Sequence, residues 1–196
     1  MRPLLQAVGV DRQLNGHSPN IERSARRGYF HLQYGSPADA AQPISAAIEE
    51  VWGAISAPGN LELCHPFCAS NPVSVWPGAE SRDEVHYLNG RVFERSFRSW
   101  TEGVGYELEI GEPGGKGSFV SWELVPNGRE GCTLSITVYP HPVESVPAAL
   151  RGIVHRAYVG PMLSKYLSSV VRGFEWYVIR GEPVPRNQFG SHRWFS

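Results

Sequence analysis

Apolar side chains recur at helical spacing early in the chain. Ile48, Val51, Trp52 and Ile55 lie at i, i+3, i+4 and i+7, which places them on one face of a helix. The pattern predicts a helix that begins near Ser45, with two glutamates in its first turns, where carboxylates suit the positive end of a helix.

This helix ends abruptly and a shorter one follows it. Residues 57–59 read Ala-Pro-Gly, a sequence that stops a helix. Asn60 is a suitable cap for a second helical turn. The apolar side chains of that turn are Leu61, Leu63, Cys64 and Phe67.

From residue 68 to residue 140 the apolar period changes to two, which is typical of strands with one buried and one exposed face. The dipeptide Asn89-Gly90 is a strong hairpin signal. Successive strands of this kind predict an antiparallel meander. A first, aromatic-rich strand is expected over residues 28–34, followed by a loop over 35–43. The strands of the meander are expected over residues 72–76, 83–88, 91–100, 106–110, 120–124 and 134–138.

A long helical pattern covers residues 146–179 and closes the chain. Without interruption such a helix would approach 50 Å at about 1.5 Å per residue. Gly160-Pro161 predicts a kink or a break, because proline lacks a backbone donor and clashes with the preceding turn. Gly181 and Pro183 are expected to end the helix.

These elements predict an α+β fold in which a curved antiparallel sheet wraps around a long C-terminal helix. Two short helices near the N-terminus close one end, and a cavity lies inside. We expect one domain over residues 27–181, with residues 1–26 as a polar tail or arm. Residues 182–196 contain Phe189, Trp194 and Phe195, so we expect this tail to dock on its own body rather than form a dimer contact.

Composition narrows the functional classes. The chain has 196 residues, 41% hydrophobic and 19% charged, with a net charge of -1, which does not favour nucleic acid or an anionic membrane as a partner. Three arginines near residues 23–27 are interpreted as part of a solvated arm. Three cysteines form no disulfide framework, and no apolar run is long enough to span a bilayer or to act as a secretory signal. We therefore expect a cytoplasmic protein, either monomer or homodimer.

Three stretches of sequence resemble the polyketide cyclase/dehydrase-like proteins of the START and birch-pollen-allergen superfamily, which has the helix-grip fold. The resemblance covers about residues 28–181 and marks the fold more than any chemistry. It implies a hydrophobic cavity between the long helix and the concave sheet, used for lipids, aromatic polyketides, hormones or other small molecules. It supplies no catalytic signature and implies no cofactor. The stretches are Ala47-Ile-Glu-Glu-Val-Trp52 with Pro58-Gly-Asn-Leu61 and His65-Pro66, then Glu94-Arg-Ser-Phe-Arg-Ser-Trp100, and Gly173-Phe-Glu-Trp-Tyr-Val-Ile-Arg-Gly181.

His65 is the first candidate for chemistry. It lies within Cys64-His-Pro-Phe-Cys68, but a structural zinc site needs four ligands and the sequence holds no second cluster, so we expect no metal. At the rim of the predicted cavity, His65 is a candidate acid or base. The preferred alternative is that its imidazole only caps nearby backbone.

Glu94 and Arg98 are the next candidates, and their orientation depends on strand register. With a two-residue turn at Asn89-Gly90, Leu88 faces Arg91, and the face that holds Val85 also holds Glu94 and Arg98. A carboxylate facing an apolar cavity would have a raised pKa and could act as a general acid or base. A bulge would reverse the faces and place Arg95 inside instead.

Large aromatic side chains are candidates for the cavity wall, with ordinary core packing as the alternative. Tyr158, just before the expected helix break, is a candidate for the mouth of the cavity. The wall candidates are Trp52, Trp100, Tyr106, Trp122 and Tyr166.

The leading functional hypothesis is binding of a hydrophobic or aromatic small molecule in the cavity. One alternative is a cyclase or dehydratase that uses His65 or Glu94 to move protons. The other is a non-enzymatic interaction module that uses the C-terminal tail as its contact.

Overall fold

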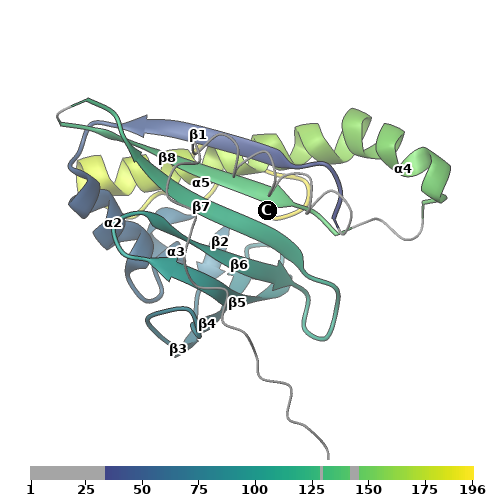
Figure 1. The fold of residues 1–196 in the computed structure, drawn as a ribbon, viewed down its shortest axis with the longest axis horizontal. Coiled ribbons are helices and arrows are strands. Elements are labelled where there is room, and N and C mark those ends of the chain that lie inside the picture. Colours follow the sequence, from purple (N-terminus) through teal and green to yellow (C-terminus); the bar gives the residue numbers. More distant parts are fainter. Residues whose placement is uncertain (1–33, 129, 142–145) are drawn as a thin grey trace, which may run out of the picture.

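One strongly curved antiparallel sheet dominates the computed structural model of the chain, which describes residues 34–128, 130–141 and 146–196 (Figure 1). In this described part the sheet has eight strands in the order β1-β8-β7-β6-β5-β4-β2, with β3 paired to β4. The strands are β1 (Ala38–Ile44), β2 (Cys68–Ser70), β3 (Val73–Val75), β4 (Arg82–Tyr87), β5 (Val92–Thr101), β6 (Gly105–Gly111), β7 (Ser118–Pro126) and β8 (Cys132–Tyr139).

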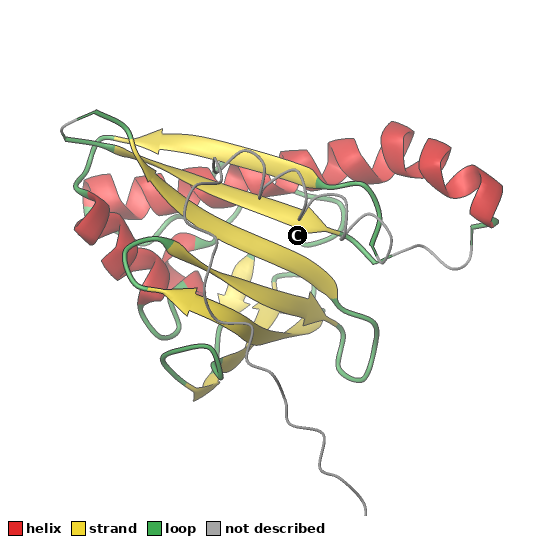
Figure 2. Ribbon diagram, viewed as in Figure 1, coloured by secondary structure: helices red, strands yellow, loops and turns green. Residues whose placement is uncertain are grey.

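Helices lie on the concave side of this sheet (Figure 2). The long helix α5 passes behind the strands, and α4 extends past their ends (Figure 1). This is the helix-grip arrangement predicted from the sequence. The helices are α2 (Ile48–Ser56), α3 (Leu61–Cys64), α4 (Ala148–Val154), the π-helical turn η1 (His155–Val159) and α5 (Gly160–Arg180).

The beginning of the sheet differs from the prediction. The strand expected over residues 28–34 lies, except for its last residue, outside the described part of the chain. The loop expected over 35–43 is wrong, because β1 occupies most of it and pairs with β8 from Ala38 opposite Val138 to Ile44 opposite Cys132. Alanine and proline are poor strand formers. Proline lacks the backbone N–H that a central strand would need, but β1 is an edge strand and has no partner strand on its open side. Helix α2 accordingly begins at Ile48 rather than near Ser45.

The long C-terminal helix is not broken at Gly160-Pro161. Instead the N–H of Gly160 bonds to the carbonyl of His155, five residues back, which makes a widened π-turn. This turn accommodates Pro161 at the start of α5, and the helical backbone continues through it. Gly181 ends α5 as predicted, in the left-handed conformation with φ 68°.

The continuous helix carries α4 beyond the sheet. Leu150 and Ile153 are 49% and 65% exposed, so the apolar residues at the start of the helical pattern do not face the core. Buried positions begin farther along, at Leu167, Val170 and Phe174 of α5.

The core lies between α5 and the concave face of the sheet. The rings of Trp122 and Phe174 are 5.2 Å apart and nearly perpendicular. The same cluster contains buried side chains from β6, β7 and β8, namely Leu108, Trp122, Leu134 and Ile136.

Helices α3 and α5 approach each other very closely at Gly173. A Cβ atom at this position would lie 2.1 Å from the carbonyl oxygen of Cys64. Only glycine therefore fits without moving one helix away from the other.

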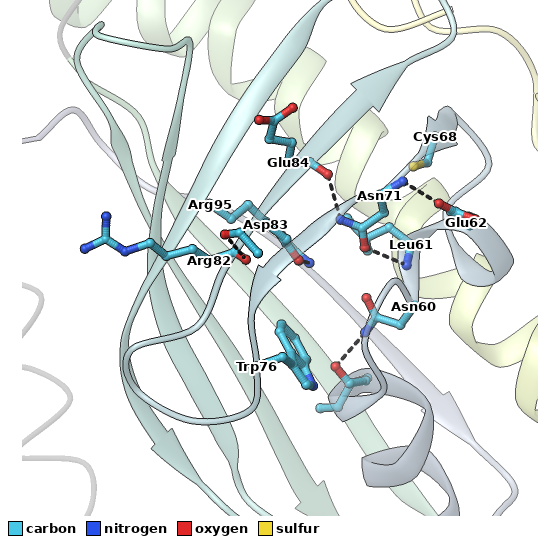
Figure 3. Close-up of polar contacts among 12 residues, drawn as sticks. Asn60, Leu61, Glu62, Cys68, Asn71, Trp76, Arg82, Asp83, Glu84 and Arg95 are labelled. Carbon is cyan, nitrogen blue, oxygen red and sulfur yellow. Dashed lines mark hydrogen bonds and ion pairs between the residues drawn. The ribbon is translucent and has the colours of Figure 1, made fainter.

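Polar contacts from Asn71 fix α3 to β4 (Figure 3). Its side-chain amide donates to the carbonyl of Glu84 at 2.7 Å and accepts from the N–H of Leu61 at 3.3 Å. Its own N–H donates to Glu62 Oε1 at 2.7 Å. Asn60 makes no side-chain cap, contrary to the prediction, since its amide donates back to the carbonyl of Ile55 at 2.6 Å.

Residues 182–196 lie against the body of the protein. The N–H of Val184 donates to the carbonyl of Leu63 at 2.8 Å, and the N–H of Asn187 donates to the carbonyl of Pro66 at 2.9 Å. The segment therefore follows α3 and the loop after it before it reaches its buried residue Phe195.

Candidate ligand cavity

A cavity of about 260 Å³ lies between the concave face of the sheet and α5. At one end it reaches charged side chains, including the ion pair between Arg91 and Glu112, whose atoms are 2.6 Å apart. Its apolar walls come from β4 to β8 and from α5, and include Val85, Leu108, Val120, Ile136, Leu163 and Val170.

Three side chains form a hydrogen-bonded chain on the wall of this cavity. His65 Nδ1 accepts from the N–H of Phe67 at 3.1 Å. A neutral imidazole then carries its proton on Nε2, which donates to the Tyr166 hydroxyl at 2.8 Å. Because the Tyr166 oxygen accepts this proton, its own O–H can donate to the Tyr87 hydroxyl, 3.0 Å away. With Tyr166 as the donor in this pair, the Tyr87 O–H at the end of the chain is left for a further acceptor.

Burial keeps every member of this chain uncharged at neutral pH. Burial, with a smaller effect from the Arg95 charge, lowers the pKa of His65 to about 3. Burial also raises the pKa of Tyr87 to about 12 and raises the pKa of Tyr166 well above its usual value. His65 is therefore poorly suited to acid or base catalysis near neutral pH. It does cap nearby backbone, which was the preferred interpretation of the sequence.

We expect His65 to make stability fall as pH falls below 6.5. Its imidazole titrates near 6.5 when unfolded and near 3 when folded, so the unfolded chain binds the proton first. The stabilisation is complete above pH 6.5 and is lost progressively toward pH 3. Between pH 8 and pH 5 the loss from His65 alone is about 2 kcal/mol. Urea unfolding of wild type and His65→Gln across this range measures it.

The glutamine variant keeps an amide that can donate to Tyr166 and does not titrate. His155 and His192 also have pKa values lowered by burial, but they are present in both proteins and cancel in the difference. Parallel stability curves for the two proteins would contradict the expectation.

Arg95 is the charged group on the inner face of β5, and Asp83 of β4 neutralises it (Figure 3). The guanidinium donates from Nε to Oδ1 at 2.7 Å and from Nη2 to Oδ2 at 2.5 Å. Both side chains are buried, 3% and 0% exposed. Arg95 lines the cavity beside Tyr87.

The predicted inward orientation of Glu94 and Arg98 is wrong. Glu94 is exposed, and Arg98 lies on the outer face, where it donates to Glu109 at 2.9 Å. A one-residue difference in register explains the error. The N–H of Tyr87 donates to the carbonyl of Arg91 at 2.8 Å, so residues 88–90 form a three-residue turn.

This register aligns the buried residues of the two strands. Val85 lies opposite Phe93, and Asp83 lies opposite Arg95. Directly opposite residues share a face, so Arg95 enters the interior without any bulge before it. A bulge does occur between Phe97 and Ser99, and it returns Trp100 to the core side.

The predicted wall residues separate into two groups. Trp122 and Tyr166 line the cavity. Trp52, Trp100 and Tyr106 instead pack together beside it, with the Trp100 and Tyr106 rings stacked at 5.3 Å. Tyr158 is 43% exposed and contacts the ring of Trp194 rather than the cavity mouth.

Sequence reasoning missed three residues of the site. Tyr87 is two residues from Val85 and therefore shares its strand face, but nothing in the sequence links it to Tyr166. Arg95 depends on the register described above. Phe195, which also lines the cavity, comes from the tail, where no periodic pattern indicates a contact.

The three cysteines are buried and free. Burial raises the pKa of Cys68 to about 12, and it raises the pKa of Cys64 and Cys132 as well. Among the described residues, no group of three or more potential ligands is placed to hold a metal ion. No helix in the described part of the chain is long and apolar enough to cross a membrane.

The family model described as polyketide cyclase / dehydrase and lipid transport matches residues 38–175. No curated protein matches the chain.

Solved structures share the fold at low sequence identity. TTHA0849 from Thermus thermophilus is 19% identical with a TM-score of 0.57, over 74% of this chain and 98% of that protein. Norcoclaurine synthase from Thalictrum flavum, solved with a transition-state analogue, is 15% identical with a TM-score of 0.55, over 74% and 95%. DynU16, from the dynemicin biosynthetic locus, is 16% identical with a TM-score of 0.53. The match covers 75% of this chain but about half, 48%, of DynU16.

Proposed function

We propose that this chain, which belongs to the polyketide cyclase / dehydrase and lipid transport family, binds a small apolar or aromatic molecule in the cavity beneath α5. The observation that carries the proposal is an apolar cavity with one oriented hydroxyl on its wall. Enclosed apolar pockets with a few convergent polar groups are typical of small-molecule sites.

The polar groups of the interior favour a ligand with an acceptor oxygen. The chain from His65 through Tyr166 ends in the O–H of Tyr87, which is a donor. Arg95 beside it offers further N–H groups and no acceptor. A carbonyl, ether or phenolic oxygen on an otherwise apolar ligand would complete this arrangement.

Binding is better supported than acid–base catalysis. His65 and the two tyrosines remain neutral at physiological pH, and Glu94 faces solvent. The structural neighbours do not decide between binding and catalysis, since norcoclaurine synthase is an enzyme by its name but, at 15% identity, shares only the fold.

Tyr87→Phe should weaken binding of ligands that contain a carbonyl. Two probes of similar size are suitable, 2-acetylnaphthalene with a carbonyl and 2-ethylnaphthalene without one. We expect about a fivefold loss of affinity for the ketone, since a neutral hydrogen bond contributes about 1 kcal/mol, and little change for the hydrocarbon. Quenching of tryptophan fluorescence measures both.

Tyr106→Phe is the matched control, because Tyr106 is buried and bonded to the carbonyl of Ile55 but does not line the cavity. Equal losses for ketone and hydrocarbon in Tyr87→Phe would argue against a directed hydrogen bond. If wild type bound neither probe, and native mass spectrometry of protein from its own host showed only the apo mass, the binding function itself would be rejected.

A further inference from the structure

The C-terminal segment contributes a ring to the cavity from outside the region that defines the family. The family match ends at residue 175, whereas Phe195 is 5% exposed and lines the cavity wall. Its ring centroid lies 4.4 Å from that of Tyr87 and 4.5 Å from that of Tyr166. Phe195 therefore covers the two hydroxyl-bearing rings, Tyr87 and Tyr166, on the wall of the cavity.

Several hydrogen bonds hold this ring in place. His192 is buried and donates from Nε2 to the carbonyl of Met162 at 3.1 Å, which ties the tail to α5. Asn89 donates from its side chain to the carbonyl of Trp194 at 2.7 Å, which ties it to the β4–β5 turn. The imidazole of His192 also stacks on Phe195 at 5.4 Å with an interplanar angle of 16°. Phe195 is thus anchored to both sides of the cavity.

The volume of the cavity suggests that the position of Phe195 limits the size of the ligand. With the tail docked, about 260 Å³ is open, just below the range of about 300–1,000 Å³ typical of ligand pockets. Phe195 belongs to the same core cluster as the walls from the sheet and α5, but it comes from a segment outside any helix or strand. Of these boundaries, the tail is the one that can yield at least cost to the core.

We propose that Phe195 is a specificity-determining residue that sets the largest ligand the cavity accepts. This inference rests on the proposed function. We expect a two-ring ligand to fit beneath the docked ring in the cavity of about 260 Å³, and a three-ring ligand to displace Phe195 and the contacts that anchor it. The displacement lowers the affinity for the larger ligand without affecting the smaller one.

The test compares 2-acetylnaphthalene with 2-acetylanthracene, which share the carbonyl and differ by one ring. Phe195→Ala should raise the affinity for the three-ring ketone about tenfold and change that for the two-ring ketone less than threefold. Phe195→Leu should give an intermediate ratio. The control Trp194→Ala removes a neighbouring aromatic of the same tail that does not line the cavity, and its ratio should equal that of wild type.

The outcomes separate this inference from the proposed function. If the two-ring ketone binds and the ratio is the same in wild type and both Phe195 variants, the size limit is wrong and the function stands. If Phe195→Ala weakens both ketones equally, Phe195 is a binding contact and the inference is likewise overturned. If neither ketone binds any of these proteins, the size limit is overturned, and the proposed function fails with it when native mass spectrometry shows only the apo mass. Thermal unfolding verifies that each variant is folded, and Phe195→Leu carries the test if the alanine variant is not.

Discussion

Asp83→Ala is expected to destabilise the protein by about 3–5 kcal/mol, the cost of leaving a buried charge without its partner. The carboxylate of Asp83 is fully buried and receives two hydrogen bonds from Arg95. Burial opposes the charge on Arg95, but Asp83 outweighs it and raises the pKa of the guanidinium. A guanidinium does not lose its proton in proteins, so Arg95 stays charged in the variant and must find water or another partner. Urea unfolding at pH 7 measures the loss.

A double variant and a surface variant make this prediction specific. Asp83→Leu combined with Arg95→Met removes both charges, and we expect it to recover most of the stability, because apolar replacement of a buried pair is often neutral or better. Glu112→Ala breaks the exposed pair with Arg91 and should cost less than about 1 kcal/mol. A loss below that value for Asp83→Ala would mean that water already reaches Arg95.

Gly173→Ala is expected to destabilise the protein by about 3 kcal/mol or more, the upper end of overpacking costs. Helix propensity alone predicts the opposite sign, because alanine is favoured over glycine within a helix by about 1 kcal/mol. The clash decides, since the new Cβ would lie 2.1 Å from the carbonyl oxygen of Cys64 and 3.1 Å from Pro66 Cδ. A backbone oxygen cannot rotate away from the new atom as a flexible side chain could, so α3 and α5 must separate.

Gly53→Ala in α2 is the matched control. A Cβ at residue 53 meets nothing within 4 Å, so only helix propensity acts, and we expect a gain of about 0.5–1 kcal/mol. Denaturant melts of the two variants should therefore shift in opposite directions. If Gly173→Ala were also stabilising, the close approach of α3 and α5 would not exist in solution.

The parts of the fold with strong periodicity could be predicted from the sequence. Strands β6, β7 and β8 alternate apolar and polar residues along most of their length, and α5 carries a clear apolar stripe that ends at Gly181. The local pattern predicts these elements correctly because the strands and α5 each bury one face against the other element.

The errors occur where tertiary contacts outweigh local pattern. Strand β1 consists mostly of alanine and polar residues, and it is a strand because β8 offers a free edge. Glycine and proline at 160–161 predict a kink or a break, and the structure has a π-turn directly before them instead of a break.

The candidate site was predictable only in part. Trp122 and Tyr166 follow from burial, and His65 follows from its place after α3. To place Arg95 on the inner face, one has to know that the turn is one residue longer than the dipeptide Asn89-Gly90 suggests. To place Phe195 at the cavity, one has to know where a segment without periodic pattern lies. A contact between the end of a chain and a strand about 100 residues earlier leaves no trace in local spacing.

The three buried thiols also allow local opening of the folded protein to be measured. A thiolate is the reactive form of cysteine, and burial withholds both the thiolate and access to it. Alkylation therefore proceeds only through openings of the structure. Cys64 samples the junction of α3 with α5, Cys68 the short strand β2, and Cys132 the start of β8 opposite β1. Their separate labelling rates would map which part of the scaffold opens first, without any probe being introduced.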